Sequence, residues 1–577
     1  MAQQPVWTDF FREPITRRAA LQGGAVGVGS LVLFGCGADA DDEPSSERSP
    51  TTGAGGTEAA DAMTTATLTA AIASDVGSLD PMSLGGTGGG NWPSYTTIFG
   101  GAGLVTVDPA TKEFFPGIAD SWEESPDHLT WTFTLNPSVT FHDGRPVTAE
   151  DVKFSMDRNI GQAAYNPAFE AGYSGQFEPI VADAEVLDPL TVRFNLKVPD
   201  VIFLRRPLFI VPKAYIEEVG DEGFAAAPVG AGWFKFGSHV PDSELTIERW
   251  DDYHIDFGSD VGIHPAYVQT LVQKVIPEDQ ARLAALQAGE VDLVHNVSSD
   301  IARQLEGDEG LVVHYLEGSQ PMIISINTAM ETDPTTGEAN PWRDKRVRVA
   351  ANMAVDLDAI IGSILTGRET PAYGSNTRGF GFPEELQEQR FAYDPEAAKK
   401  LLAEAGYPDG FETTMVGPTG RWPNSRSVME AVAQFLAEVG IRASVQELQY
   451  QEVTTRIKDR SLGPLVFFGM SGEDDPGNNF RYNYHSTSNF QNGGPVDITA
   501  AGDDSAKVDA LIEQSEAEFD PEKRRALLEE IITTYYLSAK NIWLYQPVTV
   551  VVTTSGWAWD IWATDLATPE YWNIRPV

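Results

Sequence analysis

The sequence is poor in cysteine. Its 577 residues contain one, Cys36. A single thiol cannot form a disulfide within the chain, and it excludes every metal site that needs several cysteines. The sequence therefore predicts no structural disulfide and no zinc or iron–sulfur centre. It also makes the position of Cys36, close to the N-terminus, informative.

Positive charge is the second shortage. The chain has 40 Lys and Arg against 84 Asp and Glu, a formal net charge of -44. Such a field repels nucleic acid phosphates, so we expect no DNA or RNA partner. An acidic surface also keeps an exported protein soluble, although it is compatible with a cationic ligand as well. The hydrophobic content of 42% is that of a globular protein, long enough for two or more folded units.

Catalytic signatures are missing too. The eight histidines form no HExxH motif, no serine lies in a GxSxG turn, and no two histidines share a metal-ligand spacing. We therefore predict no enzyme, no bound metal and no cofactor, and an unrecognised extracellular hydrolase is the alternative. His142 follows a strand in a His-Asp-Gly turn, which favours a structural role. His485 follows a candidate ligand loop, and we expect it to be a satisfied polar residue.

Residues 1–36 are typical of an export signal with a site for lipid attachment. Arg17 and Arg18 precede an uncharged run from Ala19 to Gly35 that is too short and too weakly apolar to span a bilayer, which needs about 20 apolar residues. The paired arginines favour the twin-arginine route. The run ends in Leu-Phe-Gly-Cys, which resembles a bacterial lipobox and predicts lipidation of Cys36. An ordinary secretory signal with an incidental cysteine is the alternative.

Residues 37–66 consist almost entirely of Ala, Asp, Glu, Ser, Thr, Gly and Pro. They cannot bury enough apolar surface to offset chain entropy, so they are predicted to be a flexible tether. A strand pattern begins near residue 67. The glycine-rich run from Gly85 to Gly90 lacks the Lys-Ser/Thr ending of a phosphate-binding loop, and we predict an ordinary loop there.

A series of short motifs follows in a fixed order. It contains a Trp-Glu segment, a Phe-Thr-Leu strand, a Phe-His-Asp-Gly turn, and a helix start in which Thr148 and Asp151 form a predicted capping box. Further motifs lie at 228–234, 326–330, 340–361 and 394–407. The first group occupies Trp122–Glu123, Phe133–Leu135, Phe141–Gly144 and Thr148–Val152. This order resembles the family-five extracellular solute-binding proteins, the oligopeptide, dipeptide and nickel receptors of ABC importers, from about residue 67 to the C-terminus.

The resemblance implies an α/β, periplasmic-binding-protein-like fold of two lobes with a ligand cleft at a hinge. The first lobe would span 67–319, with an extra subdomain at about 105–225. The second lobe would span 320–540, and residues 541–577 would return to the first. Continuous β-prone runs near 312–320 and 541–552 are predicted to form the hinge.

Three loops, at residues 91–95, 417–422 and 467–476, are candidates for the ligand site because a closing cleft needs aromatic walls and a few fixed charges. Arg421 could pair with a ligand carboxylate, although a surface position is the alternative. The third loop resembles the one with which peptide receptors hold a ligand ammonium group, but Gly472 stands where they present aspartate, so Glu473 or Asp474 would substitute. A solvated turn is the alternative there. The predicted ligand-binding residues are Trp92, Ser94, Tyr95, Arg421, Trp422, Phe468, Ser471, Glu473, Asp474 and Asp475.

The functional prediction is a monomeric lipoprotein on the outer face of the cytoplasmic membrane. It would capture a small solute, a peptide above all, by lobe closure and deliver it to the importer's permease. The resemblance leaves open a nickel chelate, an opine or a sugar as cargo, and a sensor of the same fold as function.

Overall fold

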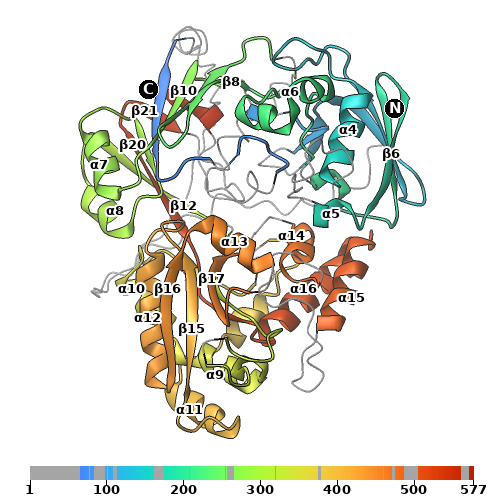
Figure 1. Ribbon diagram of the computed structural model, residues 1–577. Coiled ribbons are helices and arrows are strands. Elements are labelled where there is room, and N and C mark those ends of the chain that lie inside the picture. The colour runs from blue at the N-terminus through green and yellow to red at the C-terminus, as the bar shows by residue number, and fades with distance from the viewer. Residues whose placement is uncertain are drawn as a thin grey trace, which may run out of the picture.

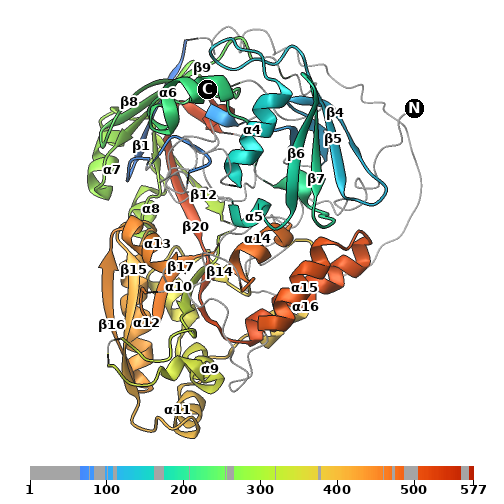
Figure 2. The same ribbon diagram turned by 45° about the vertical axis from the view of Figure 1, so that its right-hand side comes forward.

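A computed structural model describes residues 65–76, 78–83, 98–100, 102–107, 113–160, 174–206, 208–253, 255, 266–318, 320–334, 336–374, 379–458, 461–470, 475–486, 505–559 and 571–577. The predicted export signal and lipobox (1–36), nearly all of the predicted tether (37–66) and the Gly85–Gly90 loop lie outside these residues. The remainder forms a mixed α/β structure, as predicted, with two sheet-centred lobes (Figures 1 and 2).

The first lobe is built on a seven-stranded sheet in the order β12-β20-β11-β1-β10-β9-β8. The central strand β1 runs parallel to β10 and β11, and β20 runs antiparallel to β11 and β12. Side chains of β1 alternate between two faces, since Leu68 and Ala70 join one buried cluster and Ala71 another. The strands are β1 (Thr67–Ile72), β8 (Phe234–Val240), β9 (Glu244–Arg249), β10 (Thr270–Val275), β11 (Leu293–His295), β12 (Leu311–Glu317) and β20 (Val548–Thr554).

Helices cover both faces of this sheet. The cluster containing Ala71 also takes side chains from α7 and α8, and the cluster containing Leu68 takes side chains from α4 and α6. The helices are α4 (Ala149–Asn159), α6 (Lys213–Ala226), α7 (Asp279–Gln287) and α8 (Ser299–Leu305). Near the C-terminus, β21 (Trp557–Trp559) pairs antiparallel with β22 (Ile574–Pro576), which follows the 3-10 helix η6 (Tyr571–Asn573).

A four-stranded antiparallel sheet forms a subdomain beside the first lobe. Its order is β4-β5-β7-β6, and its core contains the contacting aromatic rings of Trp131, Phe133, Phe194 and Phe203. Its elements are β2 (Val105–Val107), β3 (Phe114–Pro116), β4 (Ala119–Glu124), β5 (Thr130–Leu135), α5 (Ser174–Phe177), β6 (Val181–Asp188), β7 (Thr191–Leu196) and η3 (Phe203–Arg205).

The motif-rich segment of the subdomain folds locally as its sequence predicts. The backbone N–H of Thr148 donates to the Asp151 carboxylate at 2.9 Å, which confirms the predicted cap of α4. The imidazole of His142 accepts a hydrogen bond from the Gly230 N–H at 3.1 Å, and its other nitrogen contacts the Gly232 carbonyl oxygen at 3.1 Å. Burial lowers the pKa of His142 to about 4, so this histidine is a neutral tie between two turns.

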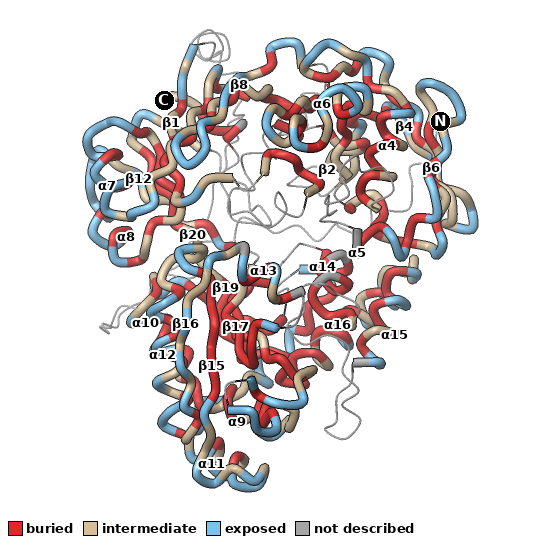
Figure 3. Tube along the Cα trace, in the orientation of Figure 1, coloured by how far each residue is buried: buried red, intermediate tan, exposed pale blue. Residues whose placement is uncertain are grey.

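The second lobe has a five-stranded sheet in the order β16-β15-β17-β13-β18, and β15 and β17 carry long runs of buried residues (Figure 3). Its strands are β13 (Met322–Ile326), β14 (Thr370–Pro371), β15 (Phe411–Pro418), β16 (Ile441–Leu448), β17 (Leu465–Gly469), β18 (Asn541–Trp543) and β19 (Tyr545–Gln546). Its helices are η4 (Pro341–Arg343), α9 (Lys345–Ala354), α10 (Leu357–Ser363), η5 (Glu384–Gln389), α11 (Pro395–Glu404), α12 (Ser425–Glu438), α13 (Tyr450–Lys458), α14 (Pro476–Asn483), α15 (Ser505–Glu516) and α16 (Pro521–Leu537).

Two chain crossings join the lobes. One leads from β12 to β13, and the other leads from β19 to β20. The crossings contact each other, because the Gly318 N–H donates to the Pro547 carbonyl at 3.0 Å and the Gln546 amide donates to the Gly318 carbonyl. The second lobe is therefore connected to the first through the edge strand β12 and its neighbour β20.

Candidate functional site

The loop between β15 and α12 of the second lobe contacts the first lobe next to the two crossings. It follows Gly417 and Pro418 at the end of β15; a Cβ atom at Gly417 would lie 2.5 Å from the Met429 sulfur, so a larger residue there would require the Met429 side chain to move. It ends at Asn424, which has a φ of 58°. The Asn424 side-chain amide donates to the Ser299 hydroxyl at 2.6 Å. Since Ser299 begins α8 of the first lobe, this hydrogen bond joins the two lobes.

Trp422 of the same loop belongs to a wall of aromatic rings. The Trp422 indole N–H donates to the Gln320 side-chain oxygen at 3.0 Å, and the ring meets Phe468 edge to face with centroids 5.4 Å apart. Phe468 in turn lies nearly parallel to Tyr450 at 6.3 Å. Two predicted site residues, Trp422 and Phe468, are thus in direct contact.

Arg421 lies against this wall. Its guanidinium carbon is 5.4 Å from the Trp422 ring centroid and 4.9 Å from that of Tyr450, which are cation–π distances. Its Nε is buried and has no hydrogen-bond partner in the described part of the chain, where Arg421 also forms no ion pair. A buried guanidinium donor without an acceptor is costly unless another group accepts from it.

His295 faces this loop from the first lobe. It ends β11, its residue is 6% exposed, and its Nε2 has no partner among the described residues. Burial lowers its pKa to about 3, and the charges of Arg282 and Arg421 add to this effect. The imidazole is therefore neutral at physiological pH and can donate or accept one hydrogen bond at Nε2. Arg282 is already partnered, by Asp279 and two backbone carbonyls.

Two cavities, of about 110 Å³ and about 250 Å³, adjoin these groups. Both are lined by His295, Asn296 and residues 421–424. The smaller cavity extends along the crossings to Glu369 and Tyr545. The larger one extends past the end of β1 to Ser74 and to Arg426. The space between the lobes beside the crossings is therefore lined from both lobes.

The other predicted ligand residues have different fates. Trp92, Ser94, Tyr95, Ser471, Glu473 and Asp474 lie outside the described residues, as does Gly472. Asp475 lines neither cavity. Its carboxylate accepts two hydrogen bonds from Arg524, at 2.7 and 2.8 Å, and one from the Gly477 N–H at the start of α14. Burial raises the pKa of Asp475, but the charge of Arg524 and these hydrogen bonds outweigh it and lower the pKa. A ligand contact by Asp475 stays a prediction.

Three residues of the site were not among the predicted ones: His295, Tyr450 and Gln320. His295 is one histidine of eight, in a short apolar strand, and only the pairing of β11 with β1 and β20 brings it to the cavity. His485 is buried and lies 3.4 Å from the Glu513 carboxylate, in keeping with the predicted satisfied residue. Within the described ranges, no three potential metal-ligating side chains cluster, and no helix is long and apolar enough to cross a membrane.

Two lobes joined by two crossings, with cavities lined from both sides, define a two-lobed solute-binding protein. Residues 113–492 match the model of the bacterial extracellular solute-binding proteins, family 5. The chain belongs to this family. It is therefore an extracytoplasmic binding protein of the kind that serves ABC importers, and not an enzyme.

Individual relatives agree with this assignment. Heme-binding protein A of Haemophilus influenzae is 29% identical over 456 residues, which cover 74% of this chain and 78% of the relative. The dipeptide-binding protein of Escherichia coli is 29% identical, over 65% and 71% of the two chains. The periplasmic binding protein DppA of Helicobacter pylori, solved with the peptide STSA, superposes with a TM-score of 0.75 at 26% identity and covers 89% of this chain and 98% of its own. These matches confirm the predicted family and fold.

Proposed function

We propose that this protein captures a small solute with a carboxylate group, a short peptide in the first instance, for an ABC importer. The observation that carries the proposal is Arg421. Its guanidinium lies on an aromatic wall between the lobes, and its buried Nε has no acceptor in the described part of the chain. An arginine that has no carboxylate partner among the described residues is suited to bind the carboxylate of a ligand.

The neutral His295 completes the proposed contact from the other lobe. A ligand carboxylate held by Arg421 can also accept a hydrogen bond from the His295 Nε2. In the other tautomer, the His295 Nε2 can accept a hydrogen bond from another group of the ligand. A ligand that contacts both lobes stabilises the arrangement in which they are close together. Closure excludes water, which strengthens the Arg421–carboxylate attraction.

Peptide cargo is supported by the relatives named for dipeptides and by the DppA complex with STSA. The runner-up is a non-peptide solute. Two observations favour it: Heme-binding protein A matches a longer stretch of the chain, and Gly472 stands where the resembling peptide receptors present aspartate.

Mass spectrometry of the small molecules that co-purify with the protein tests the cargo. A set of short peptides is the expected result, whereas one non-peptide compound or a metal complex would overturn the peptide assignment. Relative to the wild type, the loss of co-purifying small molecules should be at least ten times greater in Arg421→Met than in Arg426→Met. Arg426 is the matched control, because it lines the larger cavity but is already paired with Glu430 and Glu447. Equal retention by the two variants would contradict the role of Arg421.

We further propose that Cys36 carries lipid, that the twin-arginine route exports the chain, and that a monomer meets the permease at the outer face of the cytoplasmic membrane. The support is the sequence of residues 1–36 and the polar segment behind them. Fractionation of cells that express Cys36→Ala checks the anchor. The variant should leave the membrane fraction, and its retention there would rule out lipidation at Cys36.

A further inference from the structure

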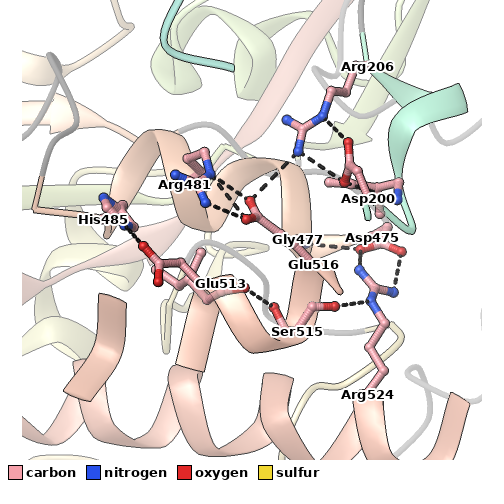
Figure 4. A network of polar contacts seen from close by, with 12 residues as sticks. Asp200, Arg206, Asp475, Gly477, Arg481, His485, Glu513, Ser515, Glu516 and Arg524 are labelled. Atoms are coloured by element: carbon pink, nitrogen blue, oxygen red, sulfur yellow. Dashed lines mark hydrogen bonds and ion pairs between the residues drawn. The ribbon is translucent and has the colours of Figure 1, made fainter. Parts of the chain in front are cut away.

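The lobes also meet at a second place, far from the crossings along the fold. There the subdomain of the first lobe faces α14 and α15 of the second (Figure 2). Four charged side chains gather at this contact, namely Asp200 and Arg206 from the first lobe and Arg481 and Glu516 from the second (Figure 4). None of the four residues is more than 8% exposed.

Each lobe brings its own ion pair. Arg206 Nε donates to the Asp200 carboxylate at 2.6 Å, and its Nη2 donates to the other oxygen at 3.2 Å. Arg481 makes the same two-point contact with Glu516, starting with Nε at 2.8 Å. Bidentate arginine–carboxylate pairs of this kind are among the strongest polar contacts in proteins.

Other contacts cross between the lobes at the same place. The Val201 N–H donates to the Glu516 backbone carbonyl at 2.8 Å, and Arg206 Nη2 lies 3.7 Å from the Glu516 carboxylate. Nearby, the ring of His128, in the turn between β4 and β5, stacks on Phe519, in the turn between α15 and α16, with centroids 3.7 Å apart.

We propose that these residues form a reversible latch between the lobes. When the lobes part, Asp200 keeps Arg206 and Glu516 keeps Arg481, so separation exposes two neutral pairs and no lone charge. A buried charge that loses its only partner is strongly destabilising, whereas a compensated pair can pass between water and the interior at a much smaller cost. The latch thus fixes the position in which the lobes close and still allows them to reopen.

The second-lobe side of the latch is held rigidly. Arg481 lies on α14, whose first turn is capped by Asp475, and Asp475 is bound to Arg524 of α16. Arg524 also donates to the Ser515 carbonyl, next to Glu516. The pair Arg481–Glu516 therefore presents a fixed surface to Arg206.

Small-angle X-ray scattering of the purified protein tests the latch. In Arg206→Met, Asp200 would be left buried without its arginine when the lobes are closed, so the lobes should open. We expect its radius of gyration to exceed that of the wild type by more than the error of the measurement. The matched control is Arg158→Met, which breaks a buried contact with Asp80 and Asp221 inside the first lobe and should leave the radius unchanged.

Phe519→Ala covers the case in which Arg206→Met fails to fold, because Phe519 is half-buried and its removal leaves no buried charge without a partner. It should shift the radius of gyration upward as well, by less. If Arg206→Met folds and has the radius of gyration of the wild type, the proposal is overturned. If Arg206→Met does not fold, a wild-type radius of gyration for Phe519→Ala overturns it. The measurement requires no knowledge of the cargo, so its outcome is independent of the carboxylate assignment at Arg421.

Discussion

The ionisable side chains named at the two places where the lobes meet differ in whether their buried polar atoms have partners. Beside the crossings, the Nε of Arg421 and the Nε2 of His295 have no partner in the described part of the chain. At the latch, Asp200, Arg206, Arg481 and Glu516 form two complete ion pairs. Buried polar groups are nearly always hydrogen-bonded in folded proteins.

This difference in hydrogen-bond partners distinguishes a region suited to ligand binding from a region suited to holding the lobes together. Groups without protein partners are available to a ligand, and a site made of them gains when the ligand arrives. Groups that already have partners give the closed arrangement its geometry and have little to offer a solute. The hinge side therefore suits recognition, and the side with α14, α15 and α16 suits mechanical closure.

The largest expected effect contrasts Arg524→Met with Arg421→Met. The first change leaves Asp475 buried without its partner and should lower the free energy of unfolding by about 3–5 kcal/mol. The second removes a side chain with no ion pair among the described residues and should cost about 1 kcal/mol or less. Denaturant-induced unfolding of the two variants measures the difference. Similar losses would mean that Arg421 supports the fold as much as Arg524 does.

The next effect is a dependence of stability on pH that comes from His295. Its pKa is about 3 in the folded protein and about 6.5 in an unfolded chain, so below pH 6.5 the unfolded state binds the extra proton. The free energy of unfolding should therefore fall as pH decreases from 6.5 toward 3, by up to about 1.4 kcal/mol per pH unit from this group. Unfolding measured at several pH values should give a shallower slope for His295→Gln.

Arg421→Met provides a check on the cause of that slope. Removing the Arg421 charge should raise the pKa of His295, because that charge is one of the causes that lower it. Part of the acid-induced loss of stability should then disappear. An unchanged slope in His295→Gln would show that His295 is not its source, whereas an unchanged slope in Arg421→Met alone would show that the Arg421 charge does not act on His295.

The smallest effect concerns the hydrogen bond from Asn424 to Ser299. Asn424→Gly removes this bond and retains the φ of 58°, which glycine adopts freely, so the expected loss is about 0.5–1.5 kcal/mol. Asn424→Ala should lose about 1 kcal/mol more, because a side chain with Cβ is strained at that φ. The two free energies of unfolding measure the bond and the strain separately. Equal losses would mean that the loop relaxes out of the left-handed conformation.

The sequence by itself determined those elements that depend on interactions between residues close together in the chain. The alternation of residues 67–72 gives β1, and Thr148 with Asp151 starts α4, since strand periodicity and helix capping act over a few residues. The ordered motifs also identified the family, and Arg421 and Trp422 were recognisable as a candidate charge and aromatic wall because they follow a predicted strand. The order of motifs carries fold information because each motif marks one turn of the same architecture.

Only the tertiary structure decided which polar groups have partners. Asp475 and Arg421 were equal candidates in the sequence, yet Arg524 arrives 49 residues later to bind Asp475, while no described acidic residue reaches Arg421. His295 came to the cavity through strand pairing, and Arg206 met Glu516 across more than 300 residues of chain. Whether a polar group forms a hydrogen bond or an ion pair depends on which groups are near it in space, and the local sequence pattern does not show this.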